Sequence, residues 1–242
     1  CRRVGAAISI ALAEQGWALA LHGHSDVEPD PALAKALSHH RTDWQGFTAD
    51  FDRPDAASEL IAEVMRVFGR APDLLVNNAS LFSEGDWHTI DFSSLQRHFA
   101  INSFAPILLS RALVEAAREG SKPAIIQIVD QRVRNPHGDQ LSYTLSKQAL
   151  AESIRTLAIA FGARARVNGV APGLTLATEH YDSDQIDRLE RAMPLDQLPE
   201  PQDVADAVLY LASAKAVTGQ LIFVDGGAHM VSFDRDFMFL ER

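Results

Sequence analysis

The sequence predicts a doubly wound α/β domain, with a parallel sheet covered by helices on both faces. Short apolar runs alternate with segments of helical period along the chain, which is typical of strand–helix–strand units. Polar residues directly follow several of these runs, at the strand ends where such sheets bind ligands. With 242 residues, 47% of them hydrophobic, the chain is long enough for one such domain, and we expect residues 1–242 to form a single unit.

Six apolar runs are predicted as buried strands because they are short and bounded by turn residues. They are residues 18–21, 46–49, 74–76, 124–129, 167–170 and 221–224. Five helices are predicted between them, at residues 6–15, 54–68, 92–119, 141–161 and 201–214, the last with Pro201 at its start. Residues 172–199 are acidic, irregular and bounded by prolines, and we expect them to form a mobile lid.

The chain opens with Cys1-Arg2-Arg3-Val4-Gly5 directly before the first helical pattern. A Rossmann-type sheet begins with a strand, a glycine-rich turn and a helix. We therefore expect on the order of ten to fifteen further residues upstream, carrying a first strand and the opening glycine of a phosphate-binding loop.

Composition excludes several classes of function. A net charge of -10 and a pI near 5.3 argue against a surface for nucleic acid or anionic membranes. Cys1 is the sole cysteine, so no intrachain disulfide can form. No apolar run approaches the roughly 20 residues that span a bilayer, and no histidine pair has the spacing of a zinc site. We expect a cytoplasmic protein without a metal that acts on a small molecule.

Four short motifs occur in order along the chain: Asn-Asn-Ala-Ser at 77–80, Tyr143 with Lys147, Val-Asn-Gly-Val-Ala-Pro-Gly at 167–173, and Val-Asp-Gly-Gly at 224–227. Together they resemble the short-chain dehydrogenase/reductases, and the resemblance covers essentially the whole chain. Within that superfamily the chain is most similar to pteridine reductases and the bacterial dihydromonapterin and dihydrofolate reductases. Those enzymes also carry Asp at the position of Asp130, where most members have Ser, an Arg like Arg3 and an aromatic like Phe82.

Asn102, Asp130, Tyr143 and Lys147 are the predicted catalytic residues. Tyr143 is expected to donate a proton, and the Lys147 cation, one helical turn away, should lower the pKa of the phenol. The resemblance implies that Lys147 also binds the nicotinamide ribose and that Asn102 holds a water linking Lys147 to solvent. An exposed Tyr–Lys pair on a helix is the alternative for an isolated motif of this kind.

Asp130 directs the choice of substrate. An ionised carboxylate would repel the alkoxide formed in ketone reduction, which disfavours that reaction. If Asp130 is protonated, it can join Tyr143 in delivering a proton to a ring nitrogen while hydride reaches the adjacent carbon. If it is ionised, it can accept hydrogen bonds from the amino and N3-H groups of a pterin. Both roles remain open, as does the interpretation that the protein no longer turns over.

The cofactor is predicted to be NADP, with NADPH preferred. Gly23 stands where NAD-preferring relatives carry an acid, so His24, Ser25 and Arg3 can meet a 2'-phosphate, although Asp26 lies nearby. His24 and Ser25 as plain turn residues are the alternative. Asp50 is expected to accept from the adenine amine. The full predicted cofactor set is Arg3, Val4, Gly23, His24, Ser25, Asp50, Phe51, Asn78, Ala79, Ser80, Tyr143, Lys147, Pro172, Gly173 and Leu174.

The predicted substrate site consists of Arg3, Phe82, Asp130, Tyr143, Leu174, Thr175 and Leu176, with Leu81 beside it and His180 and Tyr181 in the lid. Phe82 is interpreted either as a stacking platform or as an ordinary packed phenylalanine. The apolar tail, residues 231–242, is expected to pack across a subunit interface, because tetrameric members of the superfamily do this; a tail packed on its own chain is the alternative.

The predicted function is an NADPH-dependent reductase of a pterin-like substrate, such as a dihydropterin or dihydrofolate, that assembles as a homotetramer. Proton delivery is assigned to Tyr143 and Asp130. A carbonyl reductase for a small ketone or a 3-oxoacyl thioester is the alternative among enzymes. A non-catalytic sensor of NADP(H) is the alternative outside them.

Overall fold

The computed structural model describes residues 1–176 and 181–240, and all strands pair in parallel. The strands are β1 (Leu19–Gly23), β2 (Trp44–Thr48), β3 (Leu74–Asn77), β4 (Ala124–Ile128), β5 (Arg166–Pro172) and β6 (Leu221–Val224). Each lies within two residues of a predicted strand. The α/β class and the parallel pairing are confirmed.

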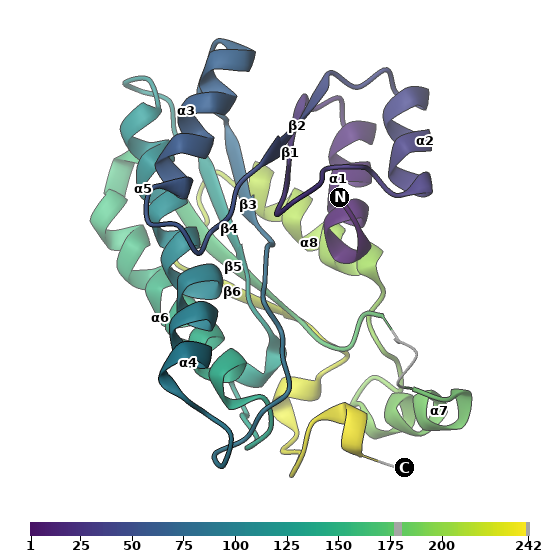
Figure 1. The fold of residues 1–242 in the computed structure, drawn as a ribbon. Coiled ribbons are helices and arrows are strands. Elements are labelled where there is room, and N and C mark those ends of the chain that lie inside the picture. The colour runs from purple at the N-terminus through teal and green to yellow at the C-terminus, as the bar shows by residue number, and fades with distance from the viewer. Residues whose placement is uncertain (177–180, 241–242) are drawn as a thin grey trace.

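The described strands form two sheets instead of the single sheet expected. β1 pairs with β2, while β3, β4, β5 and β6 pair in that order. Figure 1 shows the β1–β2 pair set apart from the edge strand β3. The predicted strand upstream of Cys1 stays a prediction.

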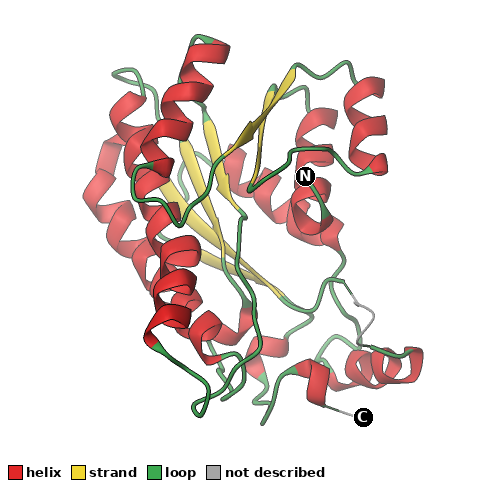
Figure 2. Ribbon diagram, in the orientation of Figure 1, coloured by secondary structure: helices red, strands yellow, loops and turns green. Residues whose placement is uncertain are grey.

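One face of the sheets is covered by α1 (Arg3–Glu14), α2 (Pro31–His39) and α8 (Pro201–Ser213) (Figures 1 and 2). Leu12, Leu33 and Val208 belong to one buried cluster with Ile126 of β4. The sequence prediction missed α2, although its start carries a recognisable signal. Asp30 accepts a hydrogen bond from the Leu33 amide at 2.9 Å, and the following proline occupies the first helical position.

The opposite face carries α3 (Ala56–Phe68), α4 (Phe92–Phe99), α5 (Ala105–Ala116) and α6 (Leu141–Phe161). Leu109, Ile125 and Leu150 pack here in a second buried cluster. The single helix predicted at 92–119 is interrupted by a π-helical turn, Ala100–Phe104, and ends at Ala116. Such a turn shifts the helical register by one residue, often at a functional site.

The 25 residues Phe92–Ala116 are long and apolar enough to cross a membrane by length and composition. The expectation that no segment approaches this length is therefore wrong. In the fold, Leu109 and Leu113 pack in the core, and Asn102 and Ser103 hydrogen-bond to Ser146 of α6. These contacts explain the apolar composition as that of a core helix in an α/β domain.

A third, smaller cluster joins α7 (Ser183–Ala192) to the end of the chain, at the base of Figure 1. Leu189 and Met193 pack with Phe237, while Phe233 and Leu240 flank them. The sequence prediction assigned no helix within 172–199, so α7 is an addition to it. The described tail residues pack on their own chain, as the alternative interpretation held, and contact with another subunit stays a prediction.

Candidate active site

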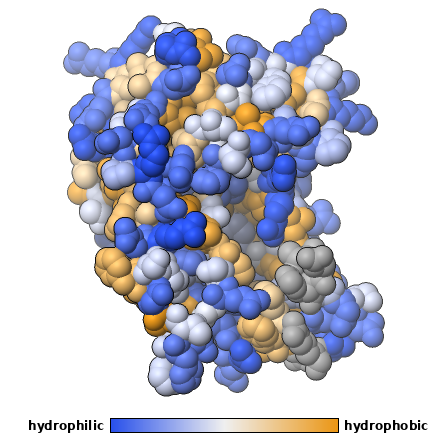
Figure 3. Space-filling model, viewed as in Figure 1, coloured by the Kyte–Doolittle hydropathy of each residue, from blue (hydrophilic) through white to orange (hydrophobic). Residues whose placement is uncertain are grey.

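A cavity of about 1630 Å³ separates the two sheets and continues past the carboxyl ends of β3, β4 and β5. Figure 3 shows the molecule hollowed on this face, with hydrophobic and hydrophilic side chains on its walls. The cavity is lined by the start of α1, the loop after β3, the end of β4, part of α6, the loop after β5 and the tail. Ligands of open parallel sheets bind in this position.

Asp130 and Tyr143 meet inside this cavity. Asp130 lies two residues past the end of β4, and the Tyr143 hydroxyl on α6 donates to its Oδ2 at 2.9 Å. The other carboxylate oxygen, Oδ1, accepts from the backbone N–H of Arg132 at 2.9 Å and from its Nε at 3.1 Å. With a guanidinium against one oxygen and only donors around both, Asp130 acts here as an ionised acceptor.

Tyr143 is held as a neutral phenol. Its side chain is buried, and burial raises its pKa well above the ordinary value; the negative charge of Asp130 raises the pKa further, while Arg132 opposes that rise. The expectation that a neighbouring lysine lowers this pKa is wrong for this geometry. The carboxylate accepts the phenolic hydrogen and therefore stabilises the protonated form.

Lys147 lies one turn further along α6 with its ammonium fully buried. Nζ donates to the Ile128 carbonyl at 2.9 Å and lies 5.8 Å from the centre of the Tyr143 ring. Burial lowers the pKa of Lys147 from 10.5 to about 8, and Asp130 opposes part of that shift. Lys147 is therefore largely protonated at neutral pH but able to lose its proton within a modest rise of pH.

Asn102 is positioned by the π-helical turn and is completely buried. Its Nδ2 donates to the Leu81 carbonyl and to the Ser146 hydroxyl, both at 2.9 Å, and its Oδ1 accepts from the Leu81 N–H at 2.7 Å. These bonds engage both ends of the side-chain amide within the protein, which differs from the water link expected. In this geometry Asn102 ties the loop after β3 to α6.

Phe82 is the next residue in that loop and reaches the catalytic pair. Its ring meets the Tyr143 ring edge to face, with 4.9 Å between ring centroids, and it is 46% exposed. An aromatic surface that is half open to a cavity suits a flat ring better than a fully packed phenylalanine would. The structure thus brings together Phe82, Asp130, Tyr143 and Lys147, as the sequence predicted.

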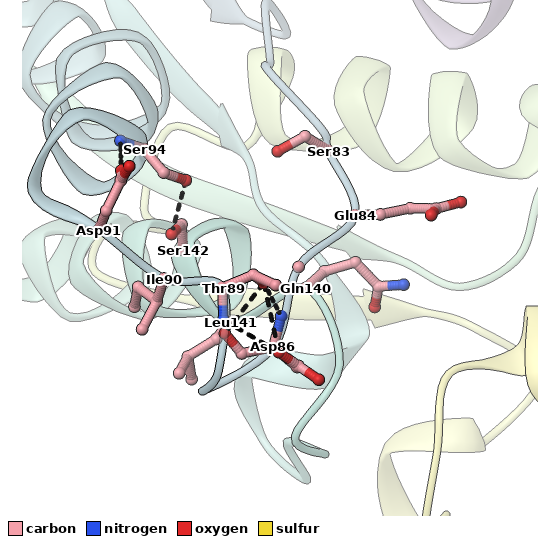
Figure 4. Close-up of a pocket in the computed structure, with 11 residues that line it drawn as sticks. Ser83, Glu84, Asp86, Thr89, Ile90, Asp91, Ser94, Gln140, Leu141 and Ser142 are labelled. Carbon is pink, nitrogen blue, oxygen red and sulfur yellow. Dashed lines mark hydrogen bonds between the residues drawn. The ribbon is translucent and has the colours of Figure 1, made fainter.

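The loop continues beyond Phe82 along the first turn of α6, as Figure 4 shows. The Leu141 N–H donates to the Gly85 carbonyl at 3.2 Å, and Ser94 donates to Ser142 at 2.9 Å. The small polar cavity in Figure 4, about 230 Å³, includes none of the predicted catalytic residues. These bonds hold the end of the loop in place, and the larger cavity remains the candidate site.

The cofactor end of the cavity is lined by most of the predicted residues. It is lined by Arg3 and Val4 at the start of α1, by Gly23 and His24 at and just after the end of β1, and by Phe51 after β2. A Cβ on Gly5 would come within 2.8 Å of Asn78 Nδ2, so the start of α1 lies against the loop after β3. No side chain caps the first N–H groups of α1 at Arg2. A helix start of this kind fits a pyrophosphate group.

Three predicted cofactor contacts differ from expectation. Ser25 and Asp50 do not line the cavity, and Asp50 Oδ1 instead lies 3.7 Å from His24 Nδ1, with both side chains exposed. A Cβ on Gly23 would fall 1.7 Å from the Asp26 carbonyl oxygen. A tight turn therefore requires glycine at position 23, whatever effect the absence of an acidic side chain there has on the choice between NADP and NAD.

The loop after β5 supplies the remaining predicted contacts. Pro172, Gly173, Leu174, Thr175, Leu176 and Tyr181 line the cavity. A Cβ on Gly173 would lie 2.8 Å from the Asp225 backbone, so this loop passes closely over the end of β6. His180 lies outside the described residues. Among the described residues, no three His, Cys, Asp or Glu side chains form a metal-binding group.

The sequence prediction missed two residues of the site, Arg132 and Asp236. Arg132 bridges Asp130 and Asp236, with a 2.7 Å bond from NH2 to Asp236 Oδ2. The spacing of Asp130 and Arg132, with an Asp at the end of a strand, is a signal for such a bond. No sequence pattern pointed to Asp236, because the contact spans 104 residues.

Comparisons with known proteins agree with this geometry. A family model described as enoyl-(acyl carrier protein) reductase matches residues 2–229. Pteridine reductase 1 of Leishmania tarentolae is 29% identical over 93% of this chain and 92% of its own length. The 3-oxoacyl-(acyl-carrier-protein) reductase FabG of a Staphylococcus epidermidis strain is also 29% identical, over 95% of this chain and 96% of its own.

Among solved structures, FolM alternative dihydrofolate reductase 1 from Brucella canis, complexed with NADP, superimposes with a TM-score of 0.86 at 33% identity. The match covers 97% of this chain and 93% of that one. The same enzyme from Brucella suis, also with NADP, gives a TM-score of 0.85 at 32% identity, over 98% and 94% of the two chains. The fold, the Tyr143–Lys147 pair and the match over residues 2–229 show that this chain belongs to the short-chain dehydrogenase/reductase superfamily.

Proposed function

We propose that this protein is an NADPH-dependent reductase of a pterin-like substrate, such as a dihydropterin or dihydrofolate. The observation that carries the proposal is the Asp130 carboxylate, which accepts the Tyr143 hydroxyl at 2.9 Å inside the cavity. A carboxylate here can accept from the amino and ring N–H groups of a pterin, which a serine hydroxyl does less well. The similarity to pteridine reductase and to FolM supports this choice.

NADPH is the proposed cofactor. Arg3, His24 and the start of α1 line one end of the cavity and supply positive charge and N–H donors for phosphate groups. Bound there, the cofactor would supply hydride. The two FolM structures that resemble this chain were solved with NADP.

Proton delivery is assigned to the Tyr143–Asp130 pair. Tyr143 carries the proton and donates it in a hydrogen bond to Asp130, so the two side chains act together in its transfer. Asp130 orients the substrate through its acceptor oxygens, and Tyr143 releases the proton to a ring nitrogen. Lys147, with its lowered pKa, is placed to return a proton to the site.

The first test is NADPH consumption by the purified protein with dihydromonapterin, dihydrobiopterin, dihydrofolate, biopterin and several simple ketones. Preference for a pterin is the expected result, and consumption of ketones alone would contradict it. Asp130→Ser should lower pterin turnover by roughly 10²- to 10⁴-fold, because it removes the acceptor that binds both substrate and Tyr143. Unchanged pterin turnover in this variant would remove the basis of the assignment.

A carbonyl reductase for 3-oxoacyl thioesters is the second candidate, since the chain is about as similar to FabG as to pteridine reductase. Under that alternative, Asp130→Ser keeps or gains activity with carbonyl substrates, because serine donates to the developing alkoxide. A protein that binds NADPH but does not oxidise it with any of these acceptors would instead be a sensor.

We also propose that the protein assembles as a homotetramer. Phe92, Phe104 and Ile159 on α4, the π-helical turn and α6 are 79%, 52% and 75% exposed. Large apolar side chains gathered on one layer of helices favour association. Light scattering coupled to size exclusion should give a mass near four chains, and a monomer at micromolar concentration would contradict this.

A further inference from the structure

Arg132 has four hydrogen bonds in the interior and is only 8% exposed at its side chain. Nε donates to Asp130 at 3.1 Å, NH1 to Gln140 at 3.0 Å and NH2 to Asp236 at 2.7 Å, while its backbone N–H also donates to Asp130. Its guanidinium carbon lies 5.1 Å from the centre of the Tyr143 ring. All three guanidinium nitrogens therefore have a partner, and the group is fixed against the catalytic pair.

The bonds form a continuous chain from the tail to the proton donor. Asp236 accepts from Arg132, Arg132 donates to Oδ1 of Asp130, and Oδ2 of Asp130 accepts the Tyr143 hydroxyl. One guanidinium charge thus serves two carboxylates. Because opposite charges at hydrogen-bond distance stabilise the ionised form of a carboxylate, the two compete for the same cation.

The tail that carries Asp236 is docked at the substrate end of the cavity. Asp236 is buried, and its backbone N–H donates to Asp139 at 2.8 Å. Phe237 and Met238 line the cavity itself. Gln185 of α7 donates to the carbonyls of Phe237 and Leu240 at 3.1 and 2.7 Å. The tail is therefore part of the active-site wall and is fastened to α7.

Among the described residues, His137, Asp139 and Arg235 are the further charged or titratable groups near Asp236. His137 lies 3.6 Å from Asp236 and 3.7 Å from Asp139, and Asp139 pairs with the exposed Arg235. Burial lowers the pKa of His137, and the Arg132 charge lowers it further. His137 is thus neutral at neutral pH. From α6, Tyr143 and Lys147 face the same carboxylate, Asp130.

We propose that Arg132 is a positioning residue whose charge is divided between Asp130 and the tail residue Asp236, so that the docked tail sets how firmly Asp130 is held as an ionised acceptor beside Tyr143. The assignment rests on the proposed catalytic role of the Tyr143–Asp130 pair. It adds a second carboxylate and the tail to that site.

Because Asp130 and Asp236 share the charge of Arg132, removing Arg132 and removing Asp236 should have opposite effects on the acid limb of the pH profile. The acid limb is the pH below which kcat/KM falls as the site takes up a proton. Arg132→Gln removes the cation, so the limb should move up by about one pH unit. Asp236→Asn removes the competitor, so the limb should move down by up to about one unit. Arg132→Lys keeps the charge without the planar fork and should fall between wild type and Arg132→Gln.

The profiles are measured with whichever acceptor the wild-type protein consumes, pterin or ketone, so failure of the pterin assignment is seen in the wild type alone. Arg235→Gln is the matched control, because it breaks an outer ion pair of the same tail segment without touching Arg132. Its acid limb should stay where it is. Shifts in the same direction for Arg132→Gln and Asp236→Asn, or no shift in either, would overturn the proposal.

Amide hydrogen exchange tests the tail without any substrate. Residues 236–240 should exchange faster in Arg132→Gln and in Asp236→Asn than in wild type or Arg235→Gln, because the Arg132–Asp236 bond is lost. Unchanged exchange in both variants would show that this bond does not hold the tail. If the protein consumes no acceptor at all, the exchange rates of residues 236–240 in these variants decide whether Arg132 couples the tail to the site.

Discussion

At the scale of single residues, burial changes the pKa of Lys147. Its ammonium is enclosed, with the Ile128 carbonyl as its hydrogen-bond acceptor, and burial lowers its pKa from 10.5 to about 8. Between these two values the unfolded chain keeps a proton that the folded chain has lost. The free energy of unfolding therefore rises with pH across this window.

The wild-type protein should gain on the order of 3 kcal/mol from this group between about pH 7 and pH 10, because a shift of one pKa unit corresponds to about 1.4 kcal/mol. Lys147→Met should flatten the rise and be more stable at neutral pH. Urea unfolding at several pH values measures both effects. Lys215→Met, at an exposed lysine, is the control and should behave as wild type; an equal slope in Lys147→Met would contradict the assignment.

Tyr143 is the second residue whose environment determines its role. A phenol with a raised pKa and a hydrogen bond to a carboxylate is a proton donor that stays protonated at neutral pH. Tyr143→Phe should lower kcat by roughly 10²- to 10⁴-fold while NADPH still binds. Single-turnover kinetics and fluorescence titration of NADPH separate these quantities. Retained turnover in Tyr143→Phe would assign proton delivery elsewhere.

At the scale of elements, the π-helical turn Ala100–Phe104 decides where Asn102 lies. A regular helix through residues 92–119 was predicted, and such a helix would present this side chain in a different register. The extra residue in the turn directs Asn102 to Leu81 and Ser146 instead. The loop that carries Phe82 is thereby fixed to the helix that carries Tyr143.

Asn102→Ala should lower the free energy of unfolding by about 1 to 3 kcal/mol, because it leaves the partly buried amide and carbonyl of Leu81 without their partner. It should also lower kcat/KM, because Phe82 follows Leu81. Denaturant midpoints and steady-state kinetics measure the two losses. Gln45→Ala, at an exposed amide side chain, serves as the control. If Asn102→Ala lowers the free energy of unfolding no more than this control does, the hydrogen bonds between Asn102 and Leu81 contribute little stability.

At the scale of the whole molecule, the described residues form two large buried clusters on either side of the sheets and a third that joins α7 to the tail. The third cluster is small and lies beside the substrate end of the cavity. Small peripheral clusters open locally at lower free energy than the global core. Substrate entry and product release are therefore expected to depend on this cluster.

Gln185→Ala removes the two bonds between α7 and the tail carbonyls. Amide exchange in residues 183–192 and 236–240 should become faster, and KM for the acceptor should rise more than kcat falls, while the denaturant midpoint of the whole domain changes little. Gln202→Ala on α8, whose side chain bonds to an exposed Asp206, is the control. Unaltered exchange in α7 would mean that the apolar contacts alone hold the tail.

The sequence by itself determined the strands, the helices α1, α3, α6 and α8, and the gathering of Asp130, Tyr143, Lys147 and Phe82 in one cavity, while it joined α4 and α5 into one helix. These followed because strand and helix periods are local, and because residues that follow parallel strands must meet at one edge of the sheet. It did not determine α2 and α7, because both patterns are short and that of α7 is also polar. It also placed Ser25 and Asp50 in a cavity that they do not line.

Only the tertiary structure decided the electrostatic state of the site. Whether Asp130 is an acid or an acceptor depends on Arg132, and how much of the charge of Arg132 it receives depends on Asp236, which is 104 residues from Arg132. The direction of the pKa of Tyr143 likewise depends on burial and on that carboxylate. Charge interactions act through space and are strengthened by burial, so local sequence patterns specify the reacting groups but not their state of ionisation.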